Sequence, residues 1–266
     1  MGPESRDAPA PPSSTTVGER DDGVALVVGR ASPGVAAAQA SSGREVHAWD
    51  LPTRLFHWAL VLGVLCGYVS RHYGDSDFVW HKWNGYTVLT LIVFRVIWGF
   101  VGGTTARFRA FFPTPVAMLR YAISLFGSKT QRFLGHNPLG AAMIIVMLIV
   151  VSCQAVTGMF NSDDVLFDGP MVPLVSERGV KLAGIAHHYI WRIILALVAI
   201  HIAANLFYGF VKREPLIQAM VTGVKPAGDY LDAKEAHGGS PWLAIPCFAL
   251  AAVVVLGTVR LLGGAL

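Results

Sequence analysis

The sequence predicts an all-α integral membrane protein, a bundle of four helices followed by a fifth membrane-spanning helix towards the C-terminus. Three observations support this prediction. Hydrophobic residues make up 53% of the 266 residues and charged residues only 14%, and the mean hydropathy of +0.51 is too high for a soluble domain of this length. The apolar residues gather in long stretches. The Lys and Arg residues cluster in particular segments that connect these stretches.

Five stretches approach the roughly 20 residues that a helix needs to cross the hydrocarbon layer of a membrane. We predict spans at residues 55–70, 79–101, 139–160, 185–211 and 242–262. The first stretch is short and requires residues from its flanks. Residues 108–126 mix aromatic side chains with arginines and prolines, so we expect this segment to lie along the membrane interface rather than to cross it.

The charges of two connecting segments predict the orientation in the membrane. Residues 103–136 contain five Lys and Arg residues and no acidic one, whereas the loop after Phe160 contains Asp163, Asp164, Asp168 and Glu177. The positive-inside rule places the basic segment in the cytoplasm. We therefore predict a multi-pass protein of the bacterial cytoplasmic (inner) membrane, with its N-terminus in the cytoplasm and its C-terminus in the periplasm. The pI is about 9.1, but the Lys and Arg residues cluster in connecting segments, as orientation signals do. This distribution argues against nucleic acid as a partner.

Composition divides the chain into three parts. Residues 1–45 are rich in Ala, Pro, Ser and Gly and lack a long apolar stretch, so we predict a disordered N-terminal tail. Residues 46–226 hold the first four spans and form the predicted membrane domain. Residues 227–266 form a linker and the fifth helix, which either contacts a partner or completes the bundle.

Two of the three histidines in the fourth stretch share one helix face. His187 and His201 are fourteen residues apart, so on a helix their side chains lie within about 40° of each other around the axis and about 21 Å apart along it. His57 lies near the inner end of the first stretch, and His81 near the outer end of the second. If the outer helix ends are level, His81 lies at the depth of His187 and His57 at the depth of His201.

Two histidine pairs at two depths are what two bis-histidine haems stacked across a bilayer need. We therefore predict that His81 and His187 bind the iron of an outer haem, and that His57 and His201 bind the iron of an inner one. Zinc fits less well, because each depth offers only two histidines and no nearby intramembrane carboxylate or thiolate. Since no C-x-x-C-H motif is present, the two predicted haems are non-covalent, b-type groups.

Two arginines repeat the fourteen-residue interval. Arg71 follows His57 and Arg95 follows His81, which brings one arginine to each depth. Both are candidates for neutralising haem propionates, and snorkelling to the interface is the alternative, especially for Arg71. His188 is the alternative ligand to His187, but it lies about 140° from His201 around the helix.

Further polar residues have less specific interpretations. His136 lies at the inner end of the third stretch, where a role in helix entry or at the interface competes with contact to haem or quinone. Gln154, Thr157 and Asn205 are candidates for supporting the ligands or contacting quinone, and hydrogen bonding between helices is the interpretation we favour for them.

Several longer segments within residues 46–226 carry a family resemblance. They are WDLPTRLFHW from Trp49, HKWNGY from His81, RVIWGFVGG from Arg95, GHNPLG from Gly135, QAVTGMF from Gln154 and KREPLIQAMVTGVK from Lys212. Together they resemble the prokaryotic cytochrome b561 family, which includes the cytochrome b subunits of nickel-iron hydrogenases. The resemblance implies a four-helix core with two b-type haems and places the ligands at His57, His81, His187 and His201. It also suggests that Gly63, Gly67 and Gly85 allow close packing, against haem or between helices.

We therefore predict a dihaem cytochrome that moves single electrons across the membrane, between the quinone pool and a redox protein. A periplasmic cytochrome c is slightly favoured as the redox protein, because the fifth helix is not needed in a hydrogenase subunit. The alternative is a cytochrome b subunit of a nickel-iron hydrogenase or a similar membrane-bound dehydrogenase. A haem-free transporter or proton relay that uses the intramembrane histidines is the alternative from another class.

Overall fold

The structure is a computed structural model that describes residues 44–73, 79–127, 131–162, 168–232 and 236–264. The predicted tail, residues 1–45, lies outside the described residues except for Arg44 and Glu45. The described elements run in this order: β1 Glu45–His47, α2 Leu51–Tyr73, α3 Val79–Val101, α4 Phe108–Phe111, α5 Pro115–Ser124, α6 Pro138–Met159, the 3₁₀ turn Val172–Leu174, α7 Glu177–Phe210, α8 Leu216–Thr222, β2 Val224–Pro226 and α9 Pro241–Leu261.

Five helices, α2, α3, α6, α7 and α9, are long and apolar enough to cross a membrane, and they correspond to the five predicted spans. The two that differ most from the prediction are α2 and α7. Helix α2 is longer than predicted at both ends. Helix α7 begins eight residues earlier than predicted, at Glu177, because Ser176 caps it by accepting a hydrogen bond from the Gly179 amide. Its 34 residues extend over about 51 Å, more than the roughly 30 Å of a hydrocarbon core.

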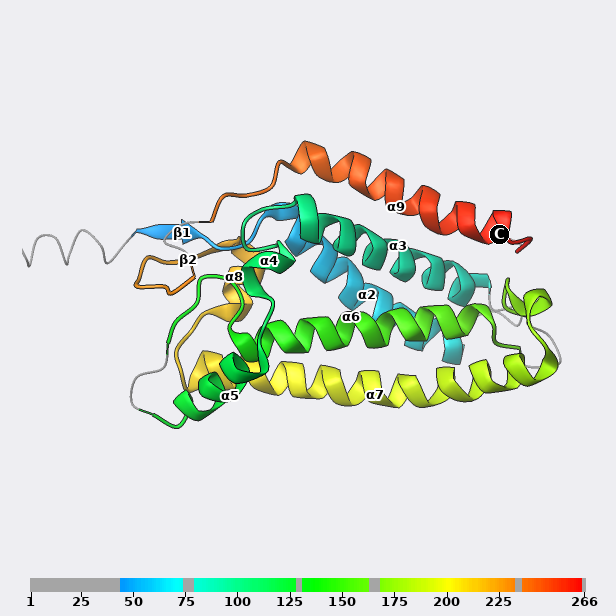
Figure 1. Ribbon diagram of the computed structural model, residues 1–266, viewed down its shortest axis with the longest axis horizontal. Coiled ribbons are helices and arrows are strands. Elements are labelled where there is room, and N and C mark those ends of the chain that lie inside the picture. Colours follow the sequence, from blue (N-terminus) through cyan, green and yellow to red (C-terminus); the bar gives the residue numbers. More distant parts are fainter. Residues whose placement is uncertain (1–43, 74–78, 128–130, 163–167, 233–235, 265–266) are drawn as a thin grey trace, which may run out of the picture. The chain divides into compact units, whose positions relative to one another are not determined.

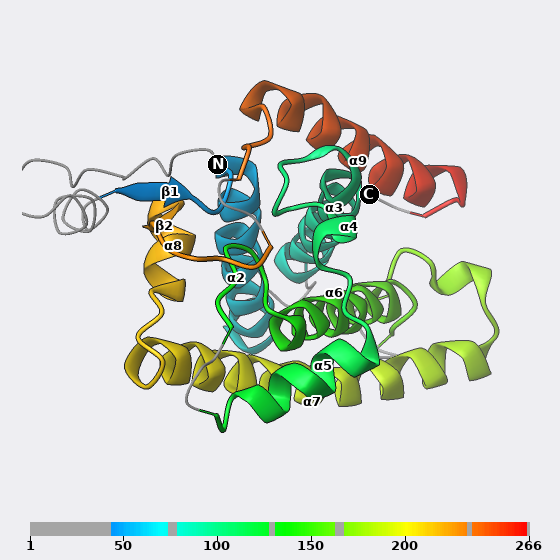
Figure 2. The same cartoon turned by 60° about the vertical axis from the view of Figure 1, so that its left-hand side comes forward.

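Helix α3 is at the centre of the bundle. It packs against α2, α6 and α9, while α7 packs mainly against α6 (Figures 1 and 2). One cluster of buried side chains on α2, α3 and α9 includes Phe56, Phe94, Trp98 and Ala251. Helix α7 has no extensive backbone contact with α2 or α3 in the described part of the chain.

The carboxylate of Asp50 joins the start of α2 to the end of α3 and to the segment before α9. It accepts hydrogen bonds from the Trp98 indole at 3.2 Å and from the backbone amides of Thr53 at 2.9 Å, Gly103 at 3.0 Å and Gly239 at 3.3 Å. An acceptor with four donors satisfies amide groups that would otherwise be unpaired at helix ends.

Strands β1 and β2 pair antiparallel, with Val46 opposite Lys225. We call the end of the bundle that carries this sheet, α4, α5 and α8 the sheet end, and the opposite end, where α7 begins, the far end (Figure 1). Lys225 is only 3% exposed and donates to the backbone carbonyls of Phe133 and Leu134, both at 2.9 Å. The sheet therefore fixes the loop that precedes α6.

The segment predicted to lie along the interface forms two short helices, α4 and α5, separated by prolines. Thr114 caps α5 by accepting a hydrogen bond from the Ala117 amide. The large apolar side chains around α5 recur every three or four residues and are strongly exposed; they are Phe112, Val116, Leu119, Ile123 and Phe126. Such an apolar stripe suits a helix that lies in the membrane interface.

Candidate functional site

Four histidines from three helices face each other in two pairs. The rings of His57 on α2 and His201 on α7 have centroids 6.4 Å apart and planes inclined by 46°. The rings of His81 on α3 and His187 on α7 have centroids 6.3 Å apart and planes inclined by 80°. His57 and His201 form the pair nearer the sheet end, and His81 and His187 the pair nearer the far end.

Both separations suit two imidazoles that bind one metal ion from opposite sides. An imidazole nitrogen binds a transition metal at about 2 Å, and a ring centre lies about 1.1 Å from its own nitrogen, so two such rings have centres about 6 Å apart. No group of three or more His, Cys, Asp or Glu side chains suited to a metal ion occurs among the described residues. The donor set at each depth is therefore two imidazoles, which is the number of axial positions on a haem iron.

At the far end, helix α6 positions His187. The Nδ1 atom of His187 lies 2.9 Å from the backbone carbonyl of Gln154, which accepts its proton, and Thr157 Oγ1 lies 3.4 Å from the same nitrogen. The side-chain amide of Gln154 lies 3.1 Å from Nε2. A Cβ on Gly158 would approach the ring to 3.0 Å, so only glycine leaves this space free. A proton held on Nδ1 leaves the lone pair on Nε2, which accepts from the Gln154 amide in this structure and is the donor that a metal would use.

His81 is positioned in the same way by the neighbouring helix α2. Its Nδ1 atom lies 3.1 Å from Ser70 Oγ, and the Ser70 hydroxyl is 3.3 Å from the Gly67 carbonyl. Arg71, which is exposed, is within electrostatic range of both His81 and His187. The sequence analysis did not identify Ser70, because a contact between two helices leaves no spacing pattern in the sequence.

The pair nearer the sheet end has fewer protein partners. Nδ1 of His57 is buried and has no hydrogen-bond partner within the described ranges. The side-chain amide of Asn205 lies 3.2 Å from Nε2 of His201. Arg95, predicted at this depth, is 2% exposed and donates through Nη2 to the Ala106 carbonyl at 3.1 Å.

The glycines near the pairs have different roles. A Cβ on Gly63 would lie 2.7 Å from Val88, and a Cβ on Gly67 would lie 3.2 Å from the Asn84 side chain, so both glycines allow α2 to approach α3. A Cβ on Gly85, one turn after His81, would meet no atom within 4 Å. Of the two alternatives left open by the sequence, helix contact therefore applies to Gly63 and Gly67, and open space is present only at Gly85.

Two other histidines differ in their surroundings. His188 is exposed, and its Nε2 atom lies 3.0 Å from Arg192 on the same helix. His136 lies between the rings of Trp49 and Phe111, at centroid distances of 4.4 and 4.8 Å. Burial, followed by the nearby cations Arg95 and Lys225, lowers the pKa of His136 well below its usual value.

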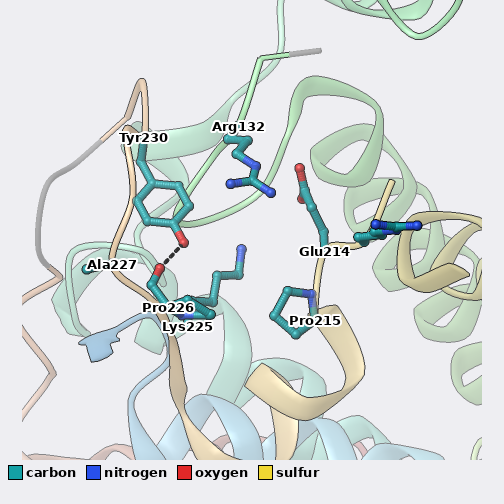
Figure 3. Close-up of a pocket in the computed structure, with 8 residues that line it drawn as sticks. Arg132, Glu214, Pro215, Lys225, Pro226, Ala227 and Tyr230 are labelled. Carbon is teal, nitrogen blue, oxygen red and sulfur yellow. Dashed lines mark hydrogen bonds between the residues drawn. The ribbon is translucent and has the colours of Figure 1, made fainter. Parts of the chain in front are cut away.

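A separate pocket lies at the sheet end, between the loop before α6 and the segment around β2. Figure 3 shows Arg132, Glu214, Lys225 and Tyr230 around it, with the Tyr230 hydroxyl donating to the Pro226 carbonyl at 2.5 Å. Burial raises the pKa of Glu214, and burial lowers the pKa of Lys225. The lining is a mixture of opposite charges, and it includes none of the four paired histidines.

Comparison with known proteins assigns this arrangement to a family. Residues 48–223, more than half of the chain, match the model of the prokaryotic cytochrome b561 family. The chain belongs to that family. This cytochrome is a membrane-bound b-type cytochrome of electron transport that binds haem b. The matched region contains all four paired histidines and ends before β2 and α9.

Three curated relatives are similar over most of their length, and each is named a probable Ni/Fe-hydrogenase B-type cytochrome subunit. The protein from Cupriavidus necator is 21% identical over 73% of this cytochrome and 92% of the relative. The proteins from Azotobacter vinelandii and Azotobacter chroococcum are each 26% identical over 67% of this cytochrome and 87% of the relative.

Proposed function

We propose that this cytochrome holds two b-type haems and transfers electrons across the bacterial cytoplasmic membrane, between the quinone pool and a redox protein. The observation that carries the proposal is the presence of two facing histidine pairs on α2, α3 and α7, each with a ring spacing suited to one iron. Haem iron, when bound, supplies one-electron redox chemistry. Membership of a cytochrome family argues against the haem-free transporter considered from the sequence.

In this proposal His81 and His187 are the axial ligands of one haem, and His57 and His201 those of the other. The Gln154 carbonyl and the Ser70 hydroxyl each hold the Nδ1 atom of one ring, so that Nε2 is the nitrogen that would bind the iron. The cations Arg71 and Arg95 would balance the propionates at the far end and the sheet end, respectively.

The separation of the two pairs supports electron transfer from one side of the membrane to the other. Fourteen residues of α7 separate His187 from His201, which corresponds to about 21 Å along the axis. Because α7 is long enough to span the membrane, the two sites lie at different depths. Electrons would then cross the hydrocarbon layer in two steps, with the sheet end on the cytoplasmic side as the positive-inside rule predicts.

Two observations bear on the redox partner. Three relatives are named probable Ni/Fe-hydrogenase B-type cytochrome subunits, which favours a subunit of a nickel-iron hydrogenase or of a similar dehydrogenase as the partner. Helix α9 lies outside the family match and packs on α3, which favours a distinct partner such as a periplasmic cytochrome c. Purification of the tagged protein from its native membrane discriminates between the two, since a hydrogenase subunit would copurify stoichiometrically and a soluble cytochrome c would not.

The direct test is a reduced-minus-oxidised absorbance spectrum together with a pyridine haemochrome assay on the purified protein. We expect two b-type haems per chain. His187→Ala and His201→Ala should each reduce this number to one, because each removes one axial ligand of a different haem. Addition of a quinol should reduce the haems of the unmodified protein.

The matched control is His188→Ala, which replaces the exposed neighbour of His187 and should leave both haems in place. Full retention of two haems in His187→Ala would contradict the assignment of that ligand. Purified wild-type protein with one haem per chain after expression in haem-replete cells would contradict the dihaem proposal as a whole.

A further inference from the structure

Of the buried side-chain nitrogens near the sheet end that lack hydrogen-bond partners in the described part of the chain, two belong to side chains that border one aromatic ring. They are Nη1 of Arg95, on α3, and Nδ1 of His136, in the loop before α6. Both side chains contact Phe111, since the Arg95 guanidinium lies 6.0 Å from the centroid of that ring and the His136 ring 4.8 Å from it. The two side chains that carry these nitrogens therefore share one aromatic neighbour.

A buried guanidinium needs an anionic partner, because removing its charge from water costs several kcal/mol unless it is paired. Asp50, the acid in electrostatic range of Arg95, is already the acceptor for Trp98 and for three backbone amides. The groups that act on His136 are the cations Arg95 and Lys225 and the histidines His201 and His57, and none of them is an acid. The site thus has positive charge and N–H donors that the described acids do not satisfy.

The position of this site identifies the anion by its chemistry. His136 is in electrostatic range of both His57 and His201, the pair nearer the sheet end. Arg95 is only 2% exposed, and the unpaired atoms of both side chains are buried, so a lipid headgroup in the surrounding bilayer has no access to them. A carboxylate on a group bound between His57 and His201 would instead approach the two side chains from inside the helix bundle.

We propose that Nη1 of Arg95 and Nδ1 of His136 together bind one propionate carboxylate of the haem held between His57 and His201. This inference rests on the proposed function and adds His136 as a positioning residue for that haem. Burial lowers the pKa of His136 and so favours the neutral ring, which has one N–H to donate, and contacts with the tilted rings of Trp49 and Phe111 fix where that ring lies.

The test is a redox titration of the holoprotein and of His136→Phe, which keeps an aromatic ring between Trp49 and Phe111 but removes the donor. A propionate without this donor has a less compensated negative charge, so the oxidised, more positive haem is favoured. At a fixed solution potential, we expect the ratio of reduced to oxidised sheet-end haem to fall threefold to tenfold. This corresponds to a midpoint potential lowered by about 28 to 59 mV, at about 59 mV per tenfold change for one electron. The His187→Ala variant should retain only the sheet-end haem, so its titration identifies which of the two redox signals belongs to that haem.

Two variants control this experiment. His136→Asn restores an N–H donor close to the position of Nδ1 and should recover most of the potential. His188→Phe makes the same replacement at an exposed histidine and should shift neither haem. An unchanged sheet-end potential in His136→Phe with both haems retained, or an equal shift of both haems, would overturn the proposal.

Removal of the carboxylate is the complementary measurement. Wild-type protein reconstituted with haem dimethyl ester, which lacks free carboxylates, should bind the ester about tenfold more weakly than haem at the sheet-end site. If the His136→Phe variant binds no haem at that site, the comparison of haem with its ester in the wild-type protein becomes the test of the proposal. Equal affinity for haem and its ester overturns the proposal. A wild-type protein that binds no haem between His57 and His201 would instead contradict the proposed function.

Discussion

At the scale of single residues, Lys225 shows how a buried charge fixes a loop. It lies in β2 and is 3% exposed, and its ammonium group donates to two carbonyls of the loop before α6, those of Phe133 and Leu134. Asp232 accepts from the backbone amides of Leu134 and Gly135 in the same loop, at 2.6 and 2.7 Å. The loop that continues to His136 is thus held from both sides by charged groups.

We expect Lys225→Met to lower the free energy of unfolding by about 2–3 kcal/mol, because two buried carbonyls lose a charged donor. The control Lys181→Met, at an exposed position of α7, should change it by less than about 0.5 kcal/mol. Thermal unfolding of the detergent-solubilised proteins measures the difference. Equal stability of the two variants would contradict the structural role of Lys225.

The pH dependence of the same variant follows from the pKa shift. Burial lowers the pKa of Lys225, although Glu214 and Asp232 oppose the shift. Between the folded pKa and the unfolded value the unfolded state binds more protons, so the contribution of Lys225 to stability increases as pH rises through that window. The difference in the free energy of unfolding between wild type and Lys225→Met should therefore increase towards pH 10. A difference that decreases over this range would contradict a lowered pKa of Lys225 in the folded protein.

At the scale of whole elements, α9 and α3 form a tight contact that the family match does not include. Ala251 of α9 is completely buried in the cluster with Phe94 and Trp98 of α3, whereas Val253 is 68% exposed on the other side of α9. Small residues at helix contacts allow such close approach in membranes. Helix α9 therefore completes the bundle on the side of α3, whatever partner it contacts with its exposed face.

Enlarging the buried contact should be costly, and enlarging the exposed side should not. We expect Ala251→Leu to destabilise the protein by about 1–3 kcal/mol through overpacking. Val253→Leu, which adds one carbon on the exposed side, should remain within about 0.5 kcal/mol of wild type. Unfolding temperatures in detergent report both effects, and a stable Ala251→Leu variant would mean that α9 is not held against α3 in solution.

At the scale of the whole molecule, the five membrane-length helices place α5 and the start of α7 at opposite ends of the bundle (Figure 1). Arg120 is exposed on α5, and Glu177 is exposed at the first residue of α7. The basic segment around α5 predicts that the sheet end is cytoplasmic. Helix α7 then projects beyond the hydrocarbon layer on the periplasmic side.

Cysteine labelling tests this orientation. The three native cysteines, Cys66, Cys153 and Cys247, are first replaced by alanine. A membrane-impermeant maleimide added to intact spheroplasts should then label the Glu177→Cys variant, and it should label the Arg120→Cys variant only after the membrane is permeabilised. The reverse pattern would invert the predicted orientation and exchange the two histidine pairs between the membrane faces.

The sequence by itself determined the five spans and the candidate histidine pairs. Long apolar stretches indicate that a helix is surrounded by the hydrocarbon of a membrane. A fourteen-residue interval sets both the angle around the helix axis and the separation along it between His187 and His201. The assignment of the pairs to haem iron stays a prediction. These properties are local or periodic along the chain, and for that reason they can be predicted from the sequence.

Only the tertiary structure decided what surrounds these histidines. The Ser70 contact to His81, the Gly158 space beside His187 and the position of His136 next to Phe111 each join different segments of the chain. The structure also showed that Gly63 and Gly67 face α3, whereas the sequence left their neighbours open. Contacts of this kind depend on how helices rotate and approach one another, which packing determines and no spacing along the sequence encodes.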